Sequence, residues 1–196
     1  MRNVRLKQID PGKDRLVLFP VDPEFRISSA DQLIRFLVSC RFVSELDRAG
    51  ESPSSMKPGE NFMRHLSFVG CAPSVASDGD PNSYNTYSVE LFVSDNDLTI
   101  IAGEHVRSPV CPLCGKRAND VLASDAIELL NDQVSWTCPE CAVSMQIEKV
   151  KWRNKLAVAR HYIQVNGVFE GEALPADKFL QDLENRTGTE WSYCYC

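Results

Sequence analysis

The chain has 196 residues, of which 43% are hydrophobic and 24% charged, with 21 basic and 27 acidic side chains. These values are typical of a globular protein with one large or two small domains, and they exclude a disordered or collagen-like chain. The net charge of −6 argues against a protein that coats DNA over its whole surface, because phosphate binding depends on a positive field.

The amino terminus is charged, and no apolar stretch of signal-peptide length follows it. The longest apolar runs, 16–21 and 33–40, are far shorter than the roughly 20 residues that cross a bilayer. We therefore expect a cytoplasmic protein without a membrane partner, in which thiols stay reduced and available as metal ligands.

The first predicted elements are a strand and a helix. Residues 16–21 form a short apolar run beside two prolines, which predicts a buried strand. Ser29 and Gln32 then fit a capping box, and apolar residues at helical spacing follow. This pattern predicts a helix from Ala30 to about Asp47.

The middle of the chain predicts strands separated by loops. A loop rich in Ser, Pro and Gly at 51–61 is followed by a predicted strand at 65–69. Residues 87–94 alternate in polarity, and a turn at 95–97 leads into an apolar run at 98–102. The two runs are therefore predicted to pair as an antiparallel hairpin.

The carboxyl-terminal part repeats the alternation of strand and helix. Residues 162–173 predict a strand, with Asn166 and Gly167 as a possible hairpin turn. A helix is predicted over 175–187, with proline near its first turn and Gly188 after its end. Residues 191–196 predict a final strand, with Ser192, Cys194 and Cys196 on one face and three aromatic residues on the other.

Two Cys-x-x-Cys pairs supply the strongest chemical signal. Cys111 and Cys114 form the first pair, and Cys138 and Cys141 form the second, with 23 residues between the pairs. Two thiolates three residues apart in a tight turn can point at one cation, and two such turns supply the four sulfurs that Zn²⁺ accepts. The spacing therefore predicts a four-thiolate metal site.

The paired Cys-Pro-x-Cys turns resemble the knuckles of zinc ribbons and, more widely, of rubredoxin-like folds. The resemblance covers about residues 110–143, and Ala142 departs from it by standing where the second knuckle often has glycine. It implies a structural zinc ion, because four thiolates leave no coordination position for a catalytic water. Iron, which would make an electron carrier, and four unrelated thiols or redox pairs remain alternatives.

These elements together predict an α+β fold. Its body combines residues 1–105 and 151–196 into a mixed or antiparallel sheet with two helices, one from each end of the chain. Residues 106–150 form a zinc-ribbon insert, which is too short to build a hydrophobic core of its own and relies on the metal.

A basic segment follows the cysteine pairs. Residues 151–165 contain four basic side chains and no acidic one. Cations beside aromatic rings can bind phosphates and stack on bases, which makes this segment a candidate nucleic-acid site. A packed or solvated structural face is the alternative. The candidate contact residues are Lys151, Trp152, Arg153, Lys155 and Arg160.

Three functional hypotheses follow. The first is a non-catalytic binding or adaptor protein that uses its zinc ribbon in contacts with a protein partner. The second is an enzyme with Cys71 as nucleophile and His65 as its base, or with a pocket of the body lined by His65, because Cys71 follows a predicted strand where a nucleophile can lie. A structural role for both residues is the alternative. The third is a ribbon that binds nucleic acid through the basic segment.

Overall fold

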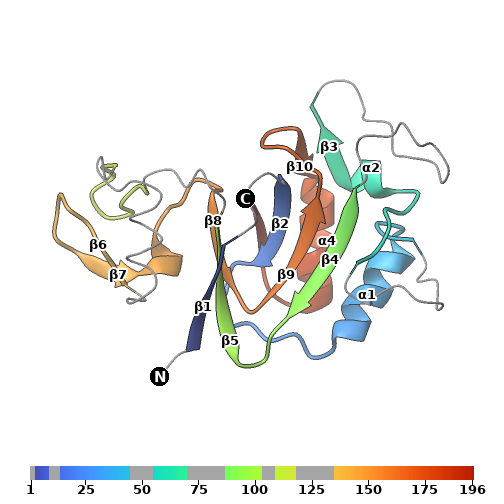
Figure 1. The fold of residues 1–196 in the computed structure, drawn as a ribbon, viewed down its shortest axis with the longest axis horizontal. Helices are drawn as coiled ribbons and strands as arrows, with labels where there is room; N and C mark the ends of the chain where they lie inside the picture. Colours follow the sequence, from blue (N-terminus) through green and yellow to red (C-terminus); the bar gives the residue numbers. More distant parts are fainter. Residues whose placement is uncertain (1–2, 9–13, 45–54, 70–86, 103–108, 118–134) are drawn as a thin grey trace.

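The computed structural model describes residues 3–8, 14–44, 55–69, 87–102, 109–117 and 135–196 (Figure 1), and their fold is α+β, as predicted. The main sheet is antiparallel, with strand order β11-β2-β9-β4. The strands predicted at 16–21 and 191–196 are confirmed as β2 and β11. The bounds are Arg15–Pro20 for β2, Ser88–Val93 for β4, His161–Asn166 for β9 and Trp191–Tyr195 for β11.

Two helices, α1 (Ala30–Ser39) and α4 (Asp177–Thr187), cover one face of the main sheet. As predicted, Ser29 caps α1, and its Oγ accepts the N–H of Gln32 at 3.4 Å. Gly188 ends α4 in the left-handed conformation at φ 77°. The largest core lies between these helices and the sheet, and the helices contribute Leu33, Leu37, Phe179 and Leu183 to it.

A second sheet packs against the opposite face of the main sheet. β5 (Asp97–Ala102) lies in its centre, parallel to β1 (Asn3–Gln8) and antiparallel to β8 (Leu156–Ala159). The apolar residues between the two sheets are Val17, Ile101, Ala157, Tyr162 and Cys194. Cys194 therefore faces away from the helix-covered core that contains Trp191 and Tyr195, as the alternation in the sequence predicted.

Smaller elements complete the described part of the chain. The predicted strand at 65–69 is confirmed as β3, which pairs with β10 and follows a short helix, α2. A separate hairpin of β6 and β7 precedes a 3-10 helix, η1. The bounds are Phe62–His65 for α2, Leu66–Phe68 for β3, Ser135–Thr137 for β6, Ser144–Gln146 for β7, Ile147–Lys149 for η1 and Ala173–Pro175 for β10.

The first helix is shorter than predicted, because it ends at Ser39 instead of near Asp47. Arg41 takes the left-handed conformation at φ 59°, which α-helices of L-residues do not continue through. The N–H groups of Phe42 and Val43 both donate to the carbonyl of Leu37, so the chain turns sharply. Both residues are fully buried. Apolar residues that matched helical spacing therefore enter the core through a turn.

The predicted hairpin between 87–94 and 98–102 is wrong, although both strands exist. β4 pairs with β9 in the main sheet, and β5 pairs with β1 and β8 in the second sheet. The reason is that β5 is buried on both of its faces. Leu98 and Ile100 lie in one core, whereas Ile101 lies in another, so β5 needs cover on both sides.

The strand predicted over 162–173 is two strands in different sheets. β9 ends at Asn166, and Gly167 turns the chain at φ 84°. The chain continues to β10, which pairs with β3, so the possible hairpin at Asn166 and Gly167 is not formed. Val168 and Ala173 are fully buried in the helix-covered core, which directs this segment away from β9.

Candidate metal centre

The first cysteine pair lies in a tight turn that two backbone hydrogen bonds close. The N–H of Gly115 donates to the carbonyl of Cys111 at 2.9 Å, and the N–H of Cys111 donates to the carbonyl of Lys116 at 3.0 Å. Gly115 adopts φ 70°, a left-handed conformation that glycine takes without steric penalty. The turn thus places both thiols of the pair on one side of the loop.

The second pair repeats this geometry between β6 and β7. The N–H of Ala142 donates to the carbonyl of Cys138 at 2.9 Å, and the N–H of Cys138 donates to the carbonyl of Val143 at 2.9 Å. Ala142 occupies the position equivalent to Gly115 and is also left-handed, at φ 56°. The hydrogen bonds of the knuckle therefore impose a conformation that strains an alanine.

The two turns bring all four sulfur atoms together, with every pair within 4.8 Å. Cys111 Sγ lies 3.9 Å from Cys141 Sγ, and Cys114 Sγ lies 3.8 Å from Cys138 Sγ. A tetrahedral Zn²⁺ with bonds of about 2.3 Å requires sulfur atoms about 3.8 Å apart. The four predicted ligands therefore fit one tetrahedral cation, and their geometry is also suitable for iron.

The thiols differ in their readiness to ionise. The backbone N–H of Cys114 lowers the pKa of the Cys111 thiol to about 7. A hydrogen bond from the backbone of Val143 lowers the pKa of Cys141, but burial and the three neighbouring thiols raise it to about 12. One thiol thus loses its proton near neutral pH, whereas another keeps it until a cation replaces it, so metal binding releases protons.

Two of the four clustered cysteines are buried and two are exposed. Cys111 and Cys138 are buried, whereas Cys114 and Cys141 are exposed. Both buried cysteines belong to a core that continues into the second sheet. This core, called the module core below, consists of Leu98, Ile100, Ala102, Cys111, Trp136, Cys138, Ile147, Val150, Trp152, Leu156 and Val158.

The module core attaches the four cysteines to the second sheet through two tryptophans. For Trp152, a candidate nucleic-acid contact, this is the packed structural face that was the alternative. Trp136 lies in β6, two residues before a ligand, and is 8% exposed. Trp152 is 6% exposed, and its Nε1 donates to the carbonyl of Ile147 at 2.8 Å. Trp136 lies two positions before Cys138, and this proximity is the sequence signal that could have identified its role.

The basic segment is not an array of free cations. Lys155 and Arg160 are each 6% exposed. Lys155 forms an ion pair with Glu170, and Arg160 Nη2 donates to Glu24 Oε2 at 2.9 Å. Because Trp152 is also buried, only Lys151 and Arg153 of the five predicted contact residues expose their side chains.

Of Cys71 and His65, the predicted nucleophile and base, the described ranges include only His65. Cys71 lies outside the described residues, so its reactivity stays a prediction. His65 lies at the end of α2, where its Nε2 is 3.0 Å from the carbonyl of Cys40. Its ring packs against Phe42 and Phe179. These contacts give His65 a structural role, independent of any nucleophile.

None of the helices in the described ranges is long and apolar enough to cross a membrane. Comparisons with protein-family models, with curated proteins and with solved structures find no match to this chain. The function therefore has to be argued from the site itself.

Proposed function

We propose that the chain is a non-catalytic binding protein whose four cysteines hold a structural zinc ion. The observation that carries the proposal is the spacing of the four sulfur atoms, which suits a tetrahedral ion. Four thiolates complete the coordination of zinc and leave no position for a water or a substrate. Zinc would then stabilise the fold without performing chemistry.

The ion would join residues 106–150 to the body of the protein. Two of its ligands lie in the module core, to which β5 and β8 also contribute. Holding these ligands together fixes the two knuckles against the second sheet, so the metal stiffens a junction. A rigid junction supports a role in which the protein presents a surface to a protein partner, as an adaptor does. A reducing compartment such as the cytoplasm suits four thiolate ligands.

Nucleic-acid binding is less well supported, because three of the five candidate side chains are buried and two of these form ion pairs. The two candidate cations that remain exposed, Lys151 and Arg153, are too few to attract a phosphate backbone strongly to a chain of net charge −6.

Metal analysis of the purified full chain tests the structural role. We expect one zinc ion per chain, with iron absent, and loss of the metal in Cys114→Ser, which changes an exposed ligand and opens no cavity. Cys40→Ser is the matched control, because Cys40 is a half-buried cysteine of the helical region. A protein free of both metals, or a Cys114→Ser variant that keeps its zinc, would contradict the proposal.

The adaptor role is tested by quantitative binding. We expect a protein partner that binds the zinc-loaded chain saturably and loses affinity when Cys114→Ser removes the metal. Turnover of a substrate by the zinc-loaded protein would instead support the enzyme hypothesis. Rapid alkylation of Cys71 at neutral pH, compared with Cys40, would point in the same direction.

A further inference from the structure

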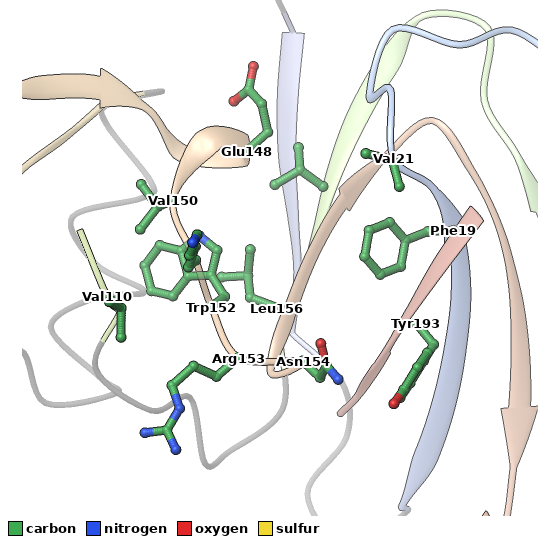
Figure 2. A pocket seen from close by; sticks show the side chains of 12 residues that line it. Phe19, Val21, Val110, Glu148, Val150, Trp152, Arg153, Asn154, Leu156 and Tyr193 are labelled. Carbon is green, nitrogen blue, oxygen red and sulfur yellow. The ribbon is translucent and has the colours of Figure 1, made fainter. Parts of the chain in front are cut away.

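A hollow of about 450 Å³ lies between the metal-binding module and the main sheet, large enough to receive a small ligand or a side chain of a partner. Figure 2 shows Trp152, Val150 and Val110 on one side of it and Phe19, Val21 and Tyr193 on the other. Eight of the twelve lining side chains are apolar or aromatic, and Val21 is 47% exposed. The hydrogen bond of Trp152 to Ile147 holds the indole ring in place. The hollow is therefore a preformed apolar site with accessible surface.

The backbone of β11 is open beside this hollow. Arg15 and Cys196 exchange two backbone hydrogen bonds of 3.0 Å. Hydrogen-bonded pairs alternate along antiparallel strands, so Cys194 and Ser192 bond to β2, and the N–H and C=O of Tyr193 point away from it. β11 is the outermost strand of the main sheet, and no backbone group in the described ranges pairs with Tyr193. An open edge of this kind can accept an additional strand.

The margin of the hollow carries positive charge. Arg153 and Asn154 lie along one margin, and Glu148 lies at the opposite end (Figure 2). Lys151 also lines the hollow. Among the described residues, neither the Lys151 nor the Arg153 side chain forms an ion pair or a hydrogen bond, in contrast to the paired Lys155 and Arg160. Two unpaired cations beside an apolar site favour an occupant with a carboxylate next to an apolar side chain.

Backbone strain is found at the same margin. Arg153 and Asn154 have φ values of 55° and 58°, and the N–H of Lys155 donates to the carbonyl of Trp152 across them at 3.2 Å. Asparagine tolerates the left-handed conformation of such a turn, but arginine does not favour it, and strain of this kind clusters at functional sites. The carbonyl of Asn154 also accepts the N–H of Tyr195 at 3.0 Å, so the turn covers the edge of β11 at Tyr195 and leaves it open at Tyr193.

We propose that the hollow binds an extended segment of a partner protein in which an apolar residue adjoins an aspartate or a glutamate. The main chain of the segment would pair with Tyr193, its apolar side chain would contact Trp152 and Phe19, and its carboxylate would meet Arg153 or Lys151. The inference rests on the proposed adaptor function and names the surface that carries it out. A free backbone edge and an apolar floor favour a peptide over a nucleic acid, which needs a broader phosphate-binding surface.

The test is selection from a phage-displayed library of random short peptides on the zinc-loaded full chain. We expect the enriched peptides to share an apolar residue beside an acidic one. The double variant Lys151→Glu with Arg153→Glu should weaken their binding by about tenfold or more. Arg64→Glu is the matched control, because Arg64 is an exposed cation on α2, away from the hollow, and it should leave binding unchanged.

A second variant tests the strand edge. Tyr193→Pro removes the outward N–H without removing a hydrogen bond to β2, and it should also weaken binding. Unchanged zinc content and circular dichroism establish that each variant is folded. If Tyr193→Pro does not fold, the charge variants still decide the question.

Four results would overturn the inference. They are a selection that enriches no peptide, peptides that bind all variants equally, retention of random oligonucleotides in place of peptides, and a homodimer in sedimentation that Tyr193→Pro dissociates. The last would identify a second copy of the chain as the occupant. Each of these results leaves the zinc content unchanged, so failure of the hollow is distinguishable from failure of the structural metal.

Discussion

Residues with the same role in the two knuckles differ in one methyl group. Gly115 and Ala142 both follow the second cysteine of a pair, both donate to the carbonyl of the first, and both are left-handed. The sequence already showed alanine where glycine is usual, but not that the backbone keeps the glycine conformation. The backbone hydrogen bonds of the knuckle outweigh the strain of one side chain, which is about 1 kcal/mol.

We therefore expect Ala142→Gly to stabilise the zinc-loaded protein by up to about 1 kcal/mol, because it relieves this strain. Gly115→Ala should destabilise it by a similar amount. A Cβ at Gly115 would contact nothing within 4 Å, so only the backbone conformation contributes there. Denaturant unfolding measures both changes. Destabilisation by Ala142→Gly together with stabilisation by Gly115→Ala, or no effect of either variant, would contradict the strain that the left-handed φ values indicate.

His161 is a second residue whose surroundings the sequence did not reveal. It is fully buried against Phe25, and neither ring nitrogen has a hydrogen-bond partner in the described part of the chain. Burial lowers the pKa of His161, against the attraction of Asp95, with Arg160 and Arg26 lowering it further. The unfolded chain therefore binds the proton more tightly than the folded one.

Stability should then fall on acidification. Above the pKa of the unfolded chain, about 6.5, His161 is neutral in both states and the free energy of unfolding has its full value. As the pH falls from there towards the lower pKa of the folded protein, the free energy of unfolding decreases by up to about 1.4 kcal/mol per pH unit. His161→Phe removes this dependence, so its free energy of unfolding should change less than that of the wild type between pH 7 and 5. Identical slopes would contradict the assignment. The two proteins should have parallel curves above pH 7.

At the scale of elements, local patterns predicted the strands and helices well and their partners poorly. Capping by Ser29 and the end of α4 at Gly188 depend on neighbouring residues, so the sequence could reveal them. The pairing of β5 depends on β1 and β8, which lie far away along the chain. The four-cysteine cluster was predictable because the spacing within each pair is local, whereas the hollow depends on side chains from distant segments.

The segment after α1 depends on one close approach. A Cβ at Gly59 would lie 2.4 Å from the carbonyl oxygen of Arg41 and 2.7 Å from that of Val43, and both are backbone atoms that cannot rotate away. We expect Gly59→Ala to destabilise the protein by about 1–3 kcal/mol, because the turn at 41–43 must shift. Thermal unfolding measures the loss. Gly171→Ala tests a glycine without such a contact, since no atom lies within 4 Å of a Cβ there, and its φ of 76° adds only the strain of a left-handed alanine, about 1 kcal/mol. A smaller effect at Gly59 than at Gly171 would argue against the close approach.

At the scale of the whole molecule, the described ranges contain separate hydrophobic cores that different elements stabilise. The helix-covered core contains side chains of the main sheet, α1 and α4, whereas the module core contains two of the four clustered cysteines and residues of β5 and β8. Loss of the ion should therefore affect the two cores unequally.

Removal of the metal by a chelator should increase amide hydrogen exchange in β5, β6 and β8 while β2 and β9 remain protected. Exchange measured by mass spectrometry on the full chain, with and without zinc, tests this expectation. The Cys114→Ser variant should reproduce the metal-free pattern. Equal loss of protection in both cores would mean that the metal supports the entire fold, and no change would mean that it supports neither.

The strand pairings also determine when the protein can fold during synthesis. β1 pairs with β5, almost a hundred positions later, and β2 lies between β9 and the last strand, β11. A nascent chain therefore holds β1 and β2 without their neighbours until β5, β9 and β11 have been synthesised. Premature termination after the second knuckle would leave Leu16 and Leu18 of β2 without the strands that flank them.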